Sequence, residues 1–218
     1  MRADLERVGF FVTIEGVEGA GKSTLAQLLA NRLSSEGVWV EVTAEPGGDP
    51  VCERIRELLL DSKNTITDRA ELLLFEAARA QHVERVIKPA LSQGALVICD
   101  RFTDSSVAYQ GWGRGIDLST VRQLNDYATT GLKPHLTILL DLPVEDGLAR
   151  TRSHDRFSQE GIRFHNAVRE GYLAMAAEEP MRFVVIDARK PVEEIVEIAL
   201  GEINSRRGAG ECSRRIGE

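Results

Sequence analysis

Residues 10–23 read Phe-Phe-Val-Thr-Ile-Glu-Gly-Val-Glu-Gly-Ala-Gly-Lys-Ser, an apolar run followed by glycines, a lysine and a serine. The run from Phe10 to Glu15 predicts a buried strand, and Gly16 to Ser23 satisfies the pattern G-x-x-x-x-G-K-[ST], which is typical of a P-loop that opens a helix. A dinucleotide-binding fingerprint is excluded, because its third glycine would fall at Thr24. The segment therefore predicts a site for nucleotide phosphates.

The P-loop pattern assigns a chemical role to each residue type. Glycines let successive backbone N–H groups converge on phosphate oxygens, and the start of a helix adds partial positive charge. Lys22 is expected to reach the β and γ phosphates, and the hydroxyl of Ser23 to bind Mg²⁺. We expect the bound nucleotide, which the family resemblance described below implies to be ATP, to contact Gly16, Val17, Glu18, Gly19, Ala20, Gly21, Lys22, Ser23 and Thr24.

Further short apolar or β-branched runs follow the first strand, and helical periodicity separates them. The longest helical stretch is expected from about Asp68 to Gln93, with a kink or a split at Pro89. Alternating strands and helices predict an α/β fold, a five-stranded parallel sheet flanked by helices. The expected strands are Phe10 to Glu15, Val38 to Thr43, Ala95 to Asp100, Leu136 to Asp141 and Phe183 to Asp187.

Composition excludes several classes of protein. The 218 residues fit one substantial domain, and 43% hydrophobic with 28% charged residues is typical of a globular protein. Its 27 Lys and Arg against 34 Asp and Glu give a net charge of −7, the wrong sign for coating nucleic acid or an anionic membrane. Cys52, Cys99 and Cys212 have no metal or redox spacing. With no apolar run long enough to span a membrane, we expect a cytoplasmic protein without nucleic-acid or membrane partners.

A P-loop alone does not identify the reaction, so the acidic residues that could bind Mg²⁺ beside it matter. The strand ending at Asp100 would place its carboxylate at the carboxyl edge of the sheet, where it can hold Mg²⁺ or its water, and Arg101 can meet a phosphate on the acceptor side. Asp141, which also ends an expected strand, is a rival for the metal role. A switch GTPase would need an Asn/Thr-Lys-x-Asp motif to read guanine, and the chain has none.

Several more blocks follow the P-loop in order. They are Glu45-Pro46-Gly47-Gly48, Leu74-Phe75-Glu76-Ala77-Ala78-Arg79-Ala80-Gln81-His82, Asp100-Arg101-Phe102, Ser105-Ser106-Val107-Ala108-Tyr109-Gln110-Gly111, and Asp155-Arg156. With the P-loop they closely resemble the bacterial type of the thymidylate kinase family, over about residues 10–203. The resemblance implies the P-loop NTPase fold of nucleoside monophosphate kinases with a short lid, ATP with Mg²⁺ as donor, dTMP as acceptor, dTDP as product and usually a homodimer.

The resemblance also implies an acceptor site. Phe75 and Arg79 are four residues apart on one helix face, and the family uses the ring to stack on thymine and the guanidinium to bind a thymine carbonyl. From the residues alone, a core Phe beside a solvated Arg would be the simpler interpretation. Tyr109 resembles the residue that crowds the 2′ position and so favours deoxyribose. The implied dTMP contacts are Glu45, Pro46, Phe75, Arg79, Arg101, Ser105, Ser106, Tyr109 and Gln110.

Glu18 lies where the family has an acid near the 3′-hydroxyl and phosphate of the acceptor. A bare carboxylate beside a phosphate cradle is unfavourable unless a hydroxyl or a cation meets it. The turn at Glu45 and Pro46 resembles one near the acceptor phosphate, for which Arg101 is the expected partner.

An arginine-rich segment at about 150–160 is interpreted as the lid. An arginine that meets the charge developing in phosphoryl transfer can be worth roughly 10³ to 10⁵ in rate, although most arginine clusters are solvated helix faces. Ala20 leaves the P-loop without the arginine that some relatives carry there, which implies a lid-supplied one. We expect Arg156, or else Arg152, to bridge the phosphates and Arg150 to contact ATP. The expected catalytic residues are Lys22, Arg101, Arg156, Arg152 and Glu18.

Residues 1–206 are expected to form one domain, and residues 207–218, which carry no apolar stripe, a disordered tail; a basic nucleic-acid arm is the alternative. The four histidines have no metal-ligand spacing, and none is assigned a catalytic role. Two other functions stay open from the sequence. One is a P-loop kinase for another nucleoside or nucleotide, and the other is a nucleotide-binding switch without acceptor-dependent ADP release.

Overall fold

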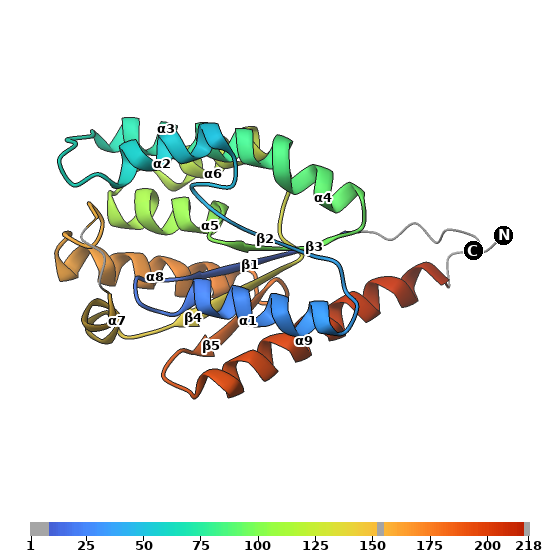
Figure 1. The fold of residues 1–218 in the computed structure, drawn as a ribbon. Coiled ribbons are helices and arrows are strands. Elements are labelled where there is room, and N and C mark those ends of the chain that lie inside the picture. Colours follow the sequence, from blue (N-terminus) through green and yellow to red (C-terminus); the bar gives the residue numbers. More distant parts are fainter. Residues whose placement is uncertain (1–8, 152–154, 216–218) are drawn as a thin grey trace.

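A five-stranded parallel sheet forms the centre of the computed structural model, which describes residues 9–151 and 155–215, with side chains to residue 208 (Figure 1). The spatial order of the strands is β2-β3-β1-β4-β5, and every neighbouring pair is parallel. The five predicted strands are all present, so the predicted fold class is confirmed. The strands are β1 (Phe10–Gly16), β2 (Val40–Ala44), β3 (Leu96–Asp100), β4 (Leu136–Asp141) and β5 (Phe183–Asp187).

Helices cover both faces of the sheet, so that Phe11, Val12 and Ile14 of the central strand β1 are fully buried (Figure 1). Right-handed crossovers assign the faces: α1 carries the chain from β1 outward to β2 and packs with α9 on one face, whereas the return connections cover the other. The helices are α1 (Lys22–Ser35), α2 (Pro50–Leu60), α3 (Asp68–His82), η1 (Val83–Ile87), α4 (Lys88–Ser92), α5 (Thr103–Ser106), η2 (Val107–Gly113), α6 (Leu118–Thr129), α7 (Val144–Arg150), α8 (Ile162–Glu178) and α9 (Val192–Arg215).

The long helical stretch predicted over residues 68–93 is present and is split as expected. α3 runs into the π-helical turn η1, and α4 follows. Pro89 has no backbone N–H, and its ring would clash with the carbonyl four residues earlier, which accounts for a widened turn directly before it. Phe75 and Arg79 therefore lie together on the regular part, α3.

The last helix is longer than the sequence predicts, because α9 continues to Arg215 where a tail was expected from residue 207. Its apolar stripe ends at the fully buried Ile203, and beyond it the four arginines, Ala209 and Glu211 favour helix whereas Gly208 and Gly210 oppose it. The prediction of a tail used only the absence of an apolar stripe and left helix propensity out. In the described ranges, no helix has the length and apolar character required to cross a membrane.

The P-loop and α7 approach each other at two glycines. A Cβ on Gly147 of α7 would lie 2.3 Å from the carbonyl oxygen of Glu18, and one on Gly19 would lie 2.1 Å from the carbonyl oxygen of Gly147. Gly19 also has a left-handed backbone, with φ 71°, which glycine adopts without strain. Backbone therefore packs directly on backbone here and fixes the height of the phosphate loop above the sheet.

This contact predicts the effect of replacing Gly147 by alanine. The added methyl group cannot avoid the Glu18 carbonyl, so we expect Gly147→Ala to lower the free energy of unfolding by about 1 to 3 kcal/mol. Gly201→Ala is the matched control, because a Cβ there, on α9, meets nothing within 4 Å and should stabilise the helix by about 0.5 to 1 kcal/mol. Urea denaturation of both variants checks the prediction, and equal stability of the two would contradict it.

Candidate active site

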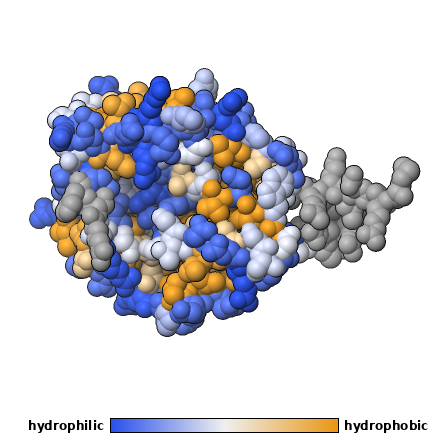
Figure 2. All heavy atoms as spheres, in the orientation of Figure 1, coloured by the Kyte–Doolittle hydropathy of each residue, from blue (hydrophilic) through white to orange (hydrophobic). Residues whose placement is uncertain are grey.

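The carboxyl ends of β1, β2 and β3 meet at one edge of the sheet, where a cleft opens. Backbone hydrogen bonds join the three exits: the N–H of Arg101 donates to Ile14 O at 3.0 Å, and the N–H of Glu45 donates to Asp100 O at 3.0 Å. The cavity has a volume of about 280 Å³. Figure 2 shows hydrophilic residues gathered on the left of the molecule, the side on which β1 ends. Open parallel sheets commonly bind ligands at such an edge.

Most residues predicted for the donor and acceptor sites meet in this cleft. Those that line it are Glu18, Gly19, Lys22, Ser23, Glu45, Pro46, Phe75, Arg79, Asp100, Arg101, Ser105, Ser106, Tyr109 and Gln110. Those that are described but do not line it are Gly16, Val17, Ala20, Gly21, Thr24, Arg150 and Arg156. Arg152 lies outside the described residues.

The P-loop joins β1 to α1 with its lysine turned inward. Gly21 has a left-handed backbone, with φ 93°, and α1 begins directly after it at Lys22. The Lys22 side chain is buried, and its Nζ donates to the carbonyl oxygen of Val17 at 2.8 Å. Burial, and after it the charge of Arg101, lowers the pKa of Lys22 to about 8. A phosphate in the cradle would restore the charged form of this amine.

Ser23 and Asp100 meet where α1 starts and β3 ends. The Ser23 hydroxyl donates to Oδ2 of Asp100, and Oδ1 is buried without a hydrogen-bond partner among the described residues. This pair fits Mg²⁺, which binds through one or two protein oxygens together with phosphates and water. The rival, Asp141, is bound at both oxygens by Arg169, at 2.6 and 2.9 Å. In the described ranges, no three His, Cys, Asp or Glu side chains are grouped as a metal site.

The carboxylate of Glu18 is held between several polar groups in the cleft. Its Oε1 accepts hydrogen bonds from Tyr109 Oη at 2.7 Å and from Arg101 Nη2 at 3.1 Å. His165 Nδ1 lies 3.2 Å from Oε2, without the alignment of a hydrogen bond. Burial alone would raise the pKa of Glu18, but His165, Arg101, Lys22 and Tyr109 together hold it well below its usual value. Glu18 is therefore a fixed negative charge in the floor of the cleft.

Glu15, the last β1 residue before the P-loop glycine, supports Arg101 from below. Arg101 has a left-handed backbone, with φ 72°, which is strained for a residue with a side chain. Glu15 Oε1 accepts the next backbone N–H, that of Phe102, at 2.8 Å, and Oε2 accepts from Ser105 Oγ at 2.7 Å and Tyr172 Oη at 2.9 Å. Complete burial raises the pKa of Glu15 to about 7. Glu15 was not among the predicted site residues, because the sequence does not show the distant side chains that bind it.

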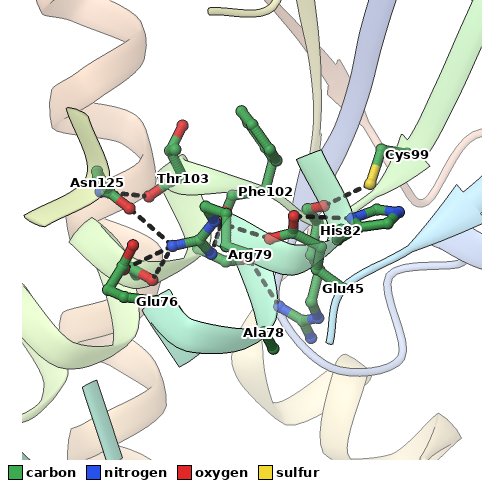
Figure 3. A network of polar contacts seen from close by, with 12 residues as sticks. Glu45, Glu76, Ala78, Arg79, His82, Cys99, Phe102, Thr103 and Asn125 are labelled. Atoms are coloured by element: carbon green, nitrogen blue, oxygen red, sulfur yellow. Dashed lines mark hydrogen bonds and ion pairs between the residues drawn. The ribbon is translucent and has the colours of Figure 1, made fainter. Parts of the chain in front are cut away.

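A network of buried polar side chains surrounds Arg79 on α3 (Figure 3). Its Nε donates to Glu45 Oε2 at 2.8 Å, and its Nη1 to Glu76 Oε1 at 2.6 Å. Burial alone would lower the pKa of Arg79, but the two carboxylates raise it further above its usual value. The other acceptors are Ser106 Oγ, Asn125 Oδ1 and Phe102 O. Arg79 thus lines the cleft with a guanidinium whose orientation the protein fixes.

His82 completes this network on the side of β2. Its Nδ1 lies 3.0 Å from Glu45 Oε1, and its Nε2 lies 2.6 Å from Thr43 Oγ1. Both carboxylate oxygens of Glu45 are therefore occupied, one by Arg79 and one by His82 (Figure 3). Glu45 orients its neighbours, and Pro46 lines the cleft beside it.

Five residues that line the cleft were not among the predicted site residues: Ala44, Arg56, Leu60, Asp155 and Phe157. Arg56 of α2 donates from Nη1 to the carbonyl oxygen of Pro46 at 2.7 Å. Phe157 lies against the aromatic wall, with its ring centroid 5.8 Å from that of Phe75 and 5.8 Å from that of Tyr109. Arg56 lies on α2, the helix that begins just after the Glu-Pro-Gly-Gly turn, and this position could have marked it as a cleft residue.

The lid arginines make other contacts than the predicted ones. Arg156 Nη2 donates to Glu71 Oε2 of α3 at 2.5 Å, because this buried carboxylate lacks solvent and attracts the nearest cation. Arg150, at the end of α7, donates to Ala188 O at 3.3 Å. Bridging of two phosphates by Arg156 therefore stays a prediction, and it would require breaking the pair with Glu71.

Known proteins are similar to this chain over most of its length. A family model described as Thymidylate kinase matches residues 14–198, which include the P-loop, the acceptor wall and β5. The chain belongs to the thymidylate kinase family. This confirms the resemblance on which the site was predicted, and with it the phosphotransferase class and the P-loop NTPase fold.

Individual members of the family are similar over nearly their whole length. A thymidylate kinase of Geotalea uraniireducens (strain Rf4) is 48% identical over 213 residues, 93% of this chain and 100% of its own. One of Geobacter sp. (strain M21) is 52% identical over 206 residues, 88% of this chain and 92% of its own. The crystal structure of thymidylate kinase from Ehrlichia chaffeensis has a TM-score of 0.77 at 35% identity, covering 90% of this chain and 99% of that one.

The raised pKa of Glu15 predicts how stability depends on pH. A carboxyl whose pKa rises on folding, here from 4.5 to about 7, contributes stability that is complete below pH 4.5 and is lost as the pH rises through 7. Glu15→Gln mimics the protonated acid. Between pH 4.5 and 8, its free energy of unfolding should therefore rise relative to that of the unchanged protein by up to about 3 kcal/mol. Urea denaturation across this range measures the difference. The exposed Glu197→Gln on α9 should show no such trend, and parallel profiles for Glu15→Gln would contradict the prediction.

Proposed function

We propose that this chain transfers the γ-phosphoryl group of ATP to dTMP and forms ADP and dTDP. The observation that carries the proposal is a single cleft in which a P-loop meets an aromatic wall, since Lys22 and Ser23 line it together with Phe75 and Tyr109. Such a cleft can hold donor phosphates and a planar base side by side. Membership of the thymidylate kinase family supports thymidylate as the acceptor.

The donor half of the proposal rests on charge. The backbone N–H groups of the P-loop and the amine of Lys22 would hold the β and γ phosphates of ATP. Ser23 and Asp100 would hold Mg²⁺, which neutralises phosphate charge when bound. Arg150, at the edge of the lid, would contact ATP, and Arg152 is the second predicted lid arginine. Catalysis here is positioning and electrostatics, so no histidine base is required.

The acceptor half rests on shape and hydrogen bonding. The ring of Phe75 would stack on the thymine, and Arg79 and Gln110 would meet its polar edge. Arg101 would bind the acceptor phosphate, because its guanidinium stands between Glu18 and the P-loop carbonyl of Gly16, 3.4 Å from the latter. The contacts at Ser105, Ser106, Tyr109, Glu45 and Pro46 would complete the acceptor site.

We further propose a homodimer that works in the cytoplasm, as the family resemblance implies. Helices α2 and α3 pack against each other. Three of their apolar side chains are about half exposed: Val51, Leu58 and Leu73. A second copy of the chain could cover them. Sedimentation equilibrium would detect the dimer, and a monomer at assay concentration would reject this part of the proposal.

The test of the proposed activity is ADP release coupled to a panel of acceptors. With Mg-ATP present, dTMP should give the highest kcat/KM among the common nucleoside monophosphates, and thymidine should not be consumed. If another monophosphate gave the highest kcat/KM, that compound would be the acceptor instead of dTMP. If the protein bound nucleotide tightly but released no ADP in response to an acceptor, it would be a nucleotide-binding switch and not a kinase.

Lys22→Ala tests the donor site. Removing the amine that neutralises the transferring phosphoryl group should lower kcat/KM by at least about a hundredfold. The exposed Lys63→Ala is the control, and both variants should keep the thermal midpoint of the unchanged protein within a few degrees. Near-normal turnover by a folded Lys22→Ala protein would contradict the assignment of Lys22 to phosphate binding.

Phe75→Ala tests the acceptor site. Stacking on a base contributes about 1 to 3 kcal/mol, so the KM for dTMP should rise about 5- to 150-fold while the KM for ATP hardly changes. Arg69→Ala, on the same helix and exposed, should change neither constant. A lower melting temperature with an unchanged KM for dTMP would instead make Phe75 a packing residue.

A further inference from the structure

Glu71 is a fully buried carboxylate on α3 on which three side chains converge. Gln110 Nε2 donates to Oε1 at 2.9 Å, and Arg156 Nη2 donates to Oε2 at 2.5 Å. Arg114 donates to both oxygens, from Nε and Nη2, at 3.2 Å each. A carboxylate without solvent is stable only when it is paired and hydrogen-bonded, and Glu71 meets that condition through elements far apart in the chain.

The two arginines on Glu71 hold residues 155–160 against the helical layer. The backbone N–H of Arg156 donates to Leu60 O at 3.2 Å, and its Nε donates to Leu59 O at 3.1 Å. It thereby satisfies two carbonyls at the end of α2, where a cation is favourable. Arg114 Nη1 lies 2.5 Å from Glu160 Oε1. The segment is thus fixed at both ends by arginines that share one carboxylate.

Phe157 lies between these two fixed points. The guanidinium carbons of Arg156 and Arg114 are 5.1 and 5.8 Å from its ring centroid. The ring is almost fully buried, lines the cleft, and packs against Phe75 and Tyr109. A planar acceptor in the cleft therefore meets a third aromatic side chain beside the two that the sequence predicted.

Gln110 connects the same carboxylate to the polar edge of the acceptor. Its side-chain nitrogen is directed to Glu71, which turns the amide oxygen to the opposite side. Gln110 lines the cleft. Glu71 thus fixes which end of this amide is presented to a ligand.

We propose that Glu71 is a positioning residue of the acceptor site, which sets the orientation of Gln110 and, through Arg156 and Arg114, places Phe157 as a contact of the acceptor base. The inference rests on the proposed function and deepens it. Arg156 then acts by holding the acceptor cavity in shape, and its guanidinium stays on Glu71 during transfer.

Kinetics separate this role from phosphate bridging. A group that shapes the acceptor cavity acts on bound dTMP before and during transfer, so its loss raises the KM for dTMP. A group that meets only the charge developing in transfer lowers kcat instead. The constants for ATP should be insensitive to the first role.

The experiment compares Glu71→Gln and Arg156→Met with the exposed control Glu84→Gln. We expect each of the first two to raise the KM for dTMP about tenfold or more, with kcat and the KM for ATP within about threefold of the unchanged protein. Glu84→Gln should change none of the three constants. The effects in the double variant should be less than additive, because both changes break the Glu71–Arg156 contact while each also loses contacts of its own.

Two milder variants keep the test decisive if Glu71→Gln fails to fold. Arg156→Lys keeps the charge but cannot reach Leu59 O and Glu71 with one fork, so its KM for dTMP should lie between those of the unchanged protein and Arg156→Met. Phe157→Leu keeps an apolar wall without a ring and should raise the KM for dTMP alone. Melting temperatures of all variants identify those that are folded.

Three results would overturn the inference. They are an unchanged KM for dTMP in folded Glu71→Gln and Arg156→Lys, additive effects in the double variant, and a hundredfold loss of kcat in Arg156→Met at constant KM. The last would restore Arg156 to the phosphates. If the unchanged protein did not phosphorylate dTMP at all, the proposed function itself would fail, which is a separate outcome.

Discussion

The guanidinium of Arg101 joins the two halves of the cleft, and the other contacts at the sheet edge depend on it. Its backbone is strained into the left-handed region and is held there by the bonds of its own N–H to β1 and of the following N–H to Glu15. Its side chain meets Glu18 from the P-loop and stacks on Tyr109 from η2, 4.9 Å from the ring centroid. One residue therefore connects the phosphate loop, the central strand and the acceptor wall.

Several buried charges around the cleft are paired with charges of the opposite sign. Arg79 lies between Glu45 and Glu76, Arg101 faces Glu18, and Glu71 faces two arginines. In a medium of low polarisability, each set is costly to break, because the partner left behind would be an unpaired buried ion. The cleft is thus preorganised by its own ion pairs, which is the condition under which fixed charges stabilise a transition state well.

Local patterns sufficed to predict the strands, the P-loop and the split at Pro89, because strand burial, glycine conformation and the missing proline N–H act within a few residues. The metal position could not be decided from the sequence, since Asp100 and Asp141 both end strands, and only the distant Arg169 distinguishes them. Glu71 looks like a surface charge in the sequence, and Glu15 ends a predicted buried strand without any sign of its partners. Their burial depends on partners as far as 85 and 157 residues away. The contact of Arg156 was unpredictable for the same reason.

The sharing of Arg101 and Glu18 by both halves of the cleft limits how the protein can be redesigned. A substitution at the β1–β3 edge changes the surroundings of donor and acceptor together, so the two affinities cannot be tuned one at a time there. Two rings of the aromatic wall are different, because Phe75 lies on α3 and Phe157 in the segment between α7 and α8, both outside the P-loop, whereas Tyr109 donates to Glu18. Libraries that seek an enzyme for unnatural nucleotide analogues should therefore vary Phe75 and Phe157 and leave the strand ends untouched.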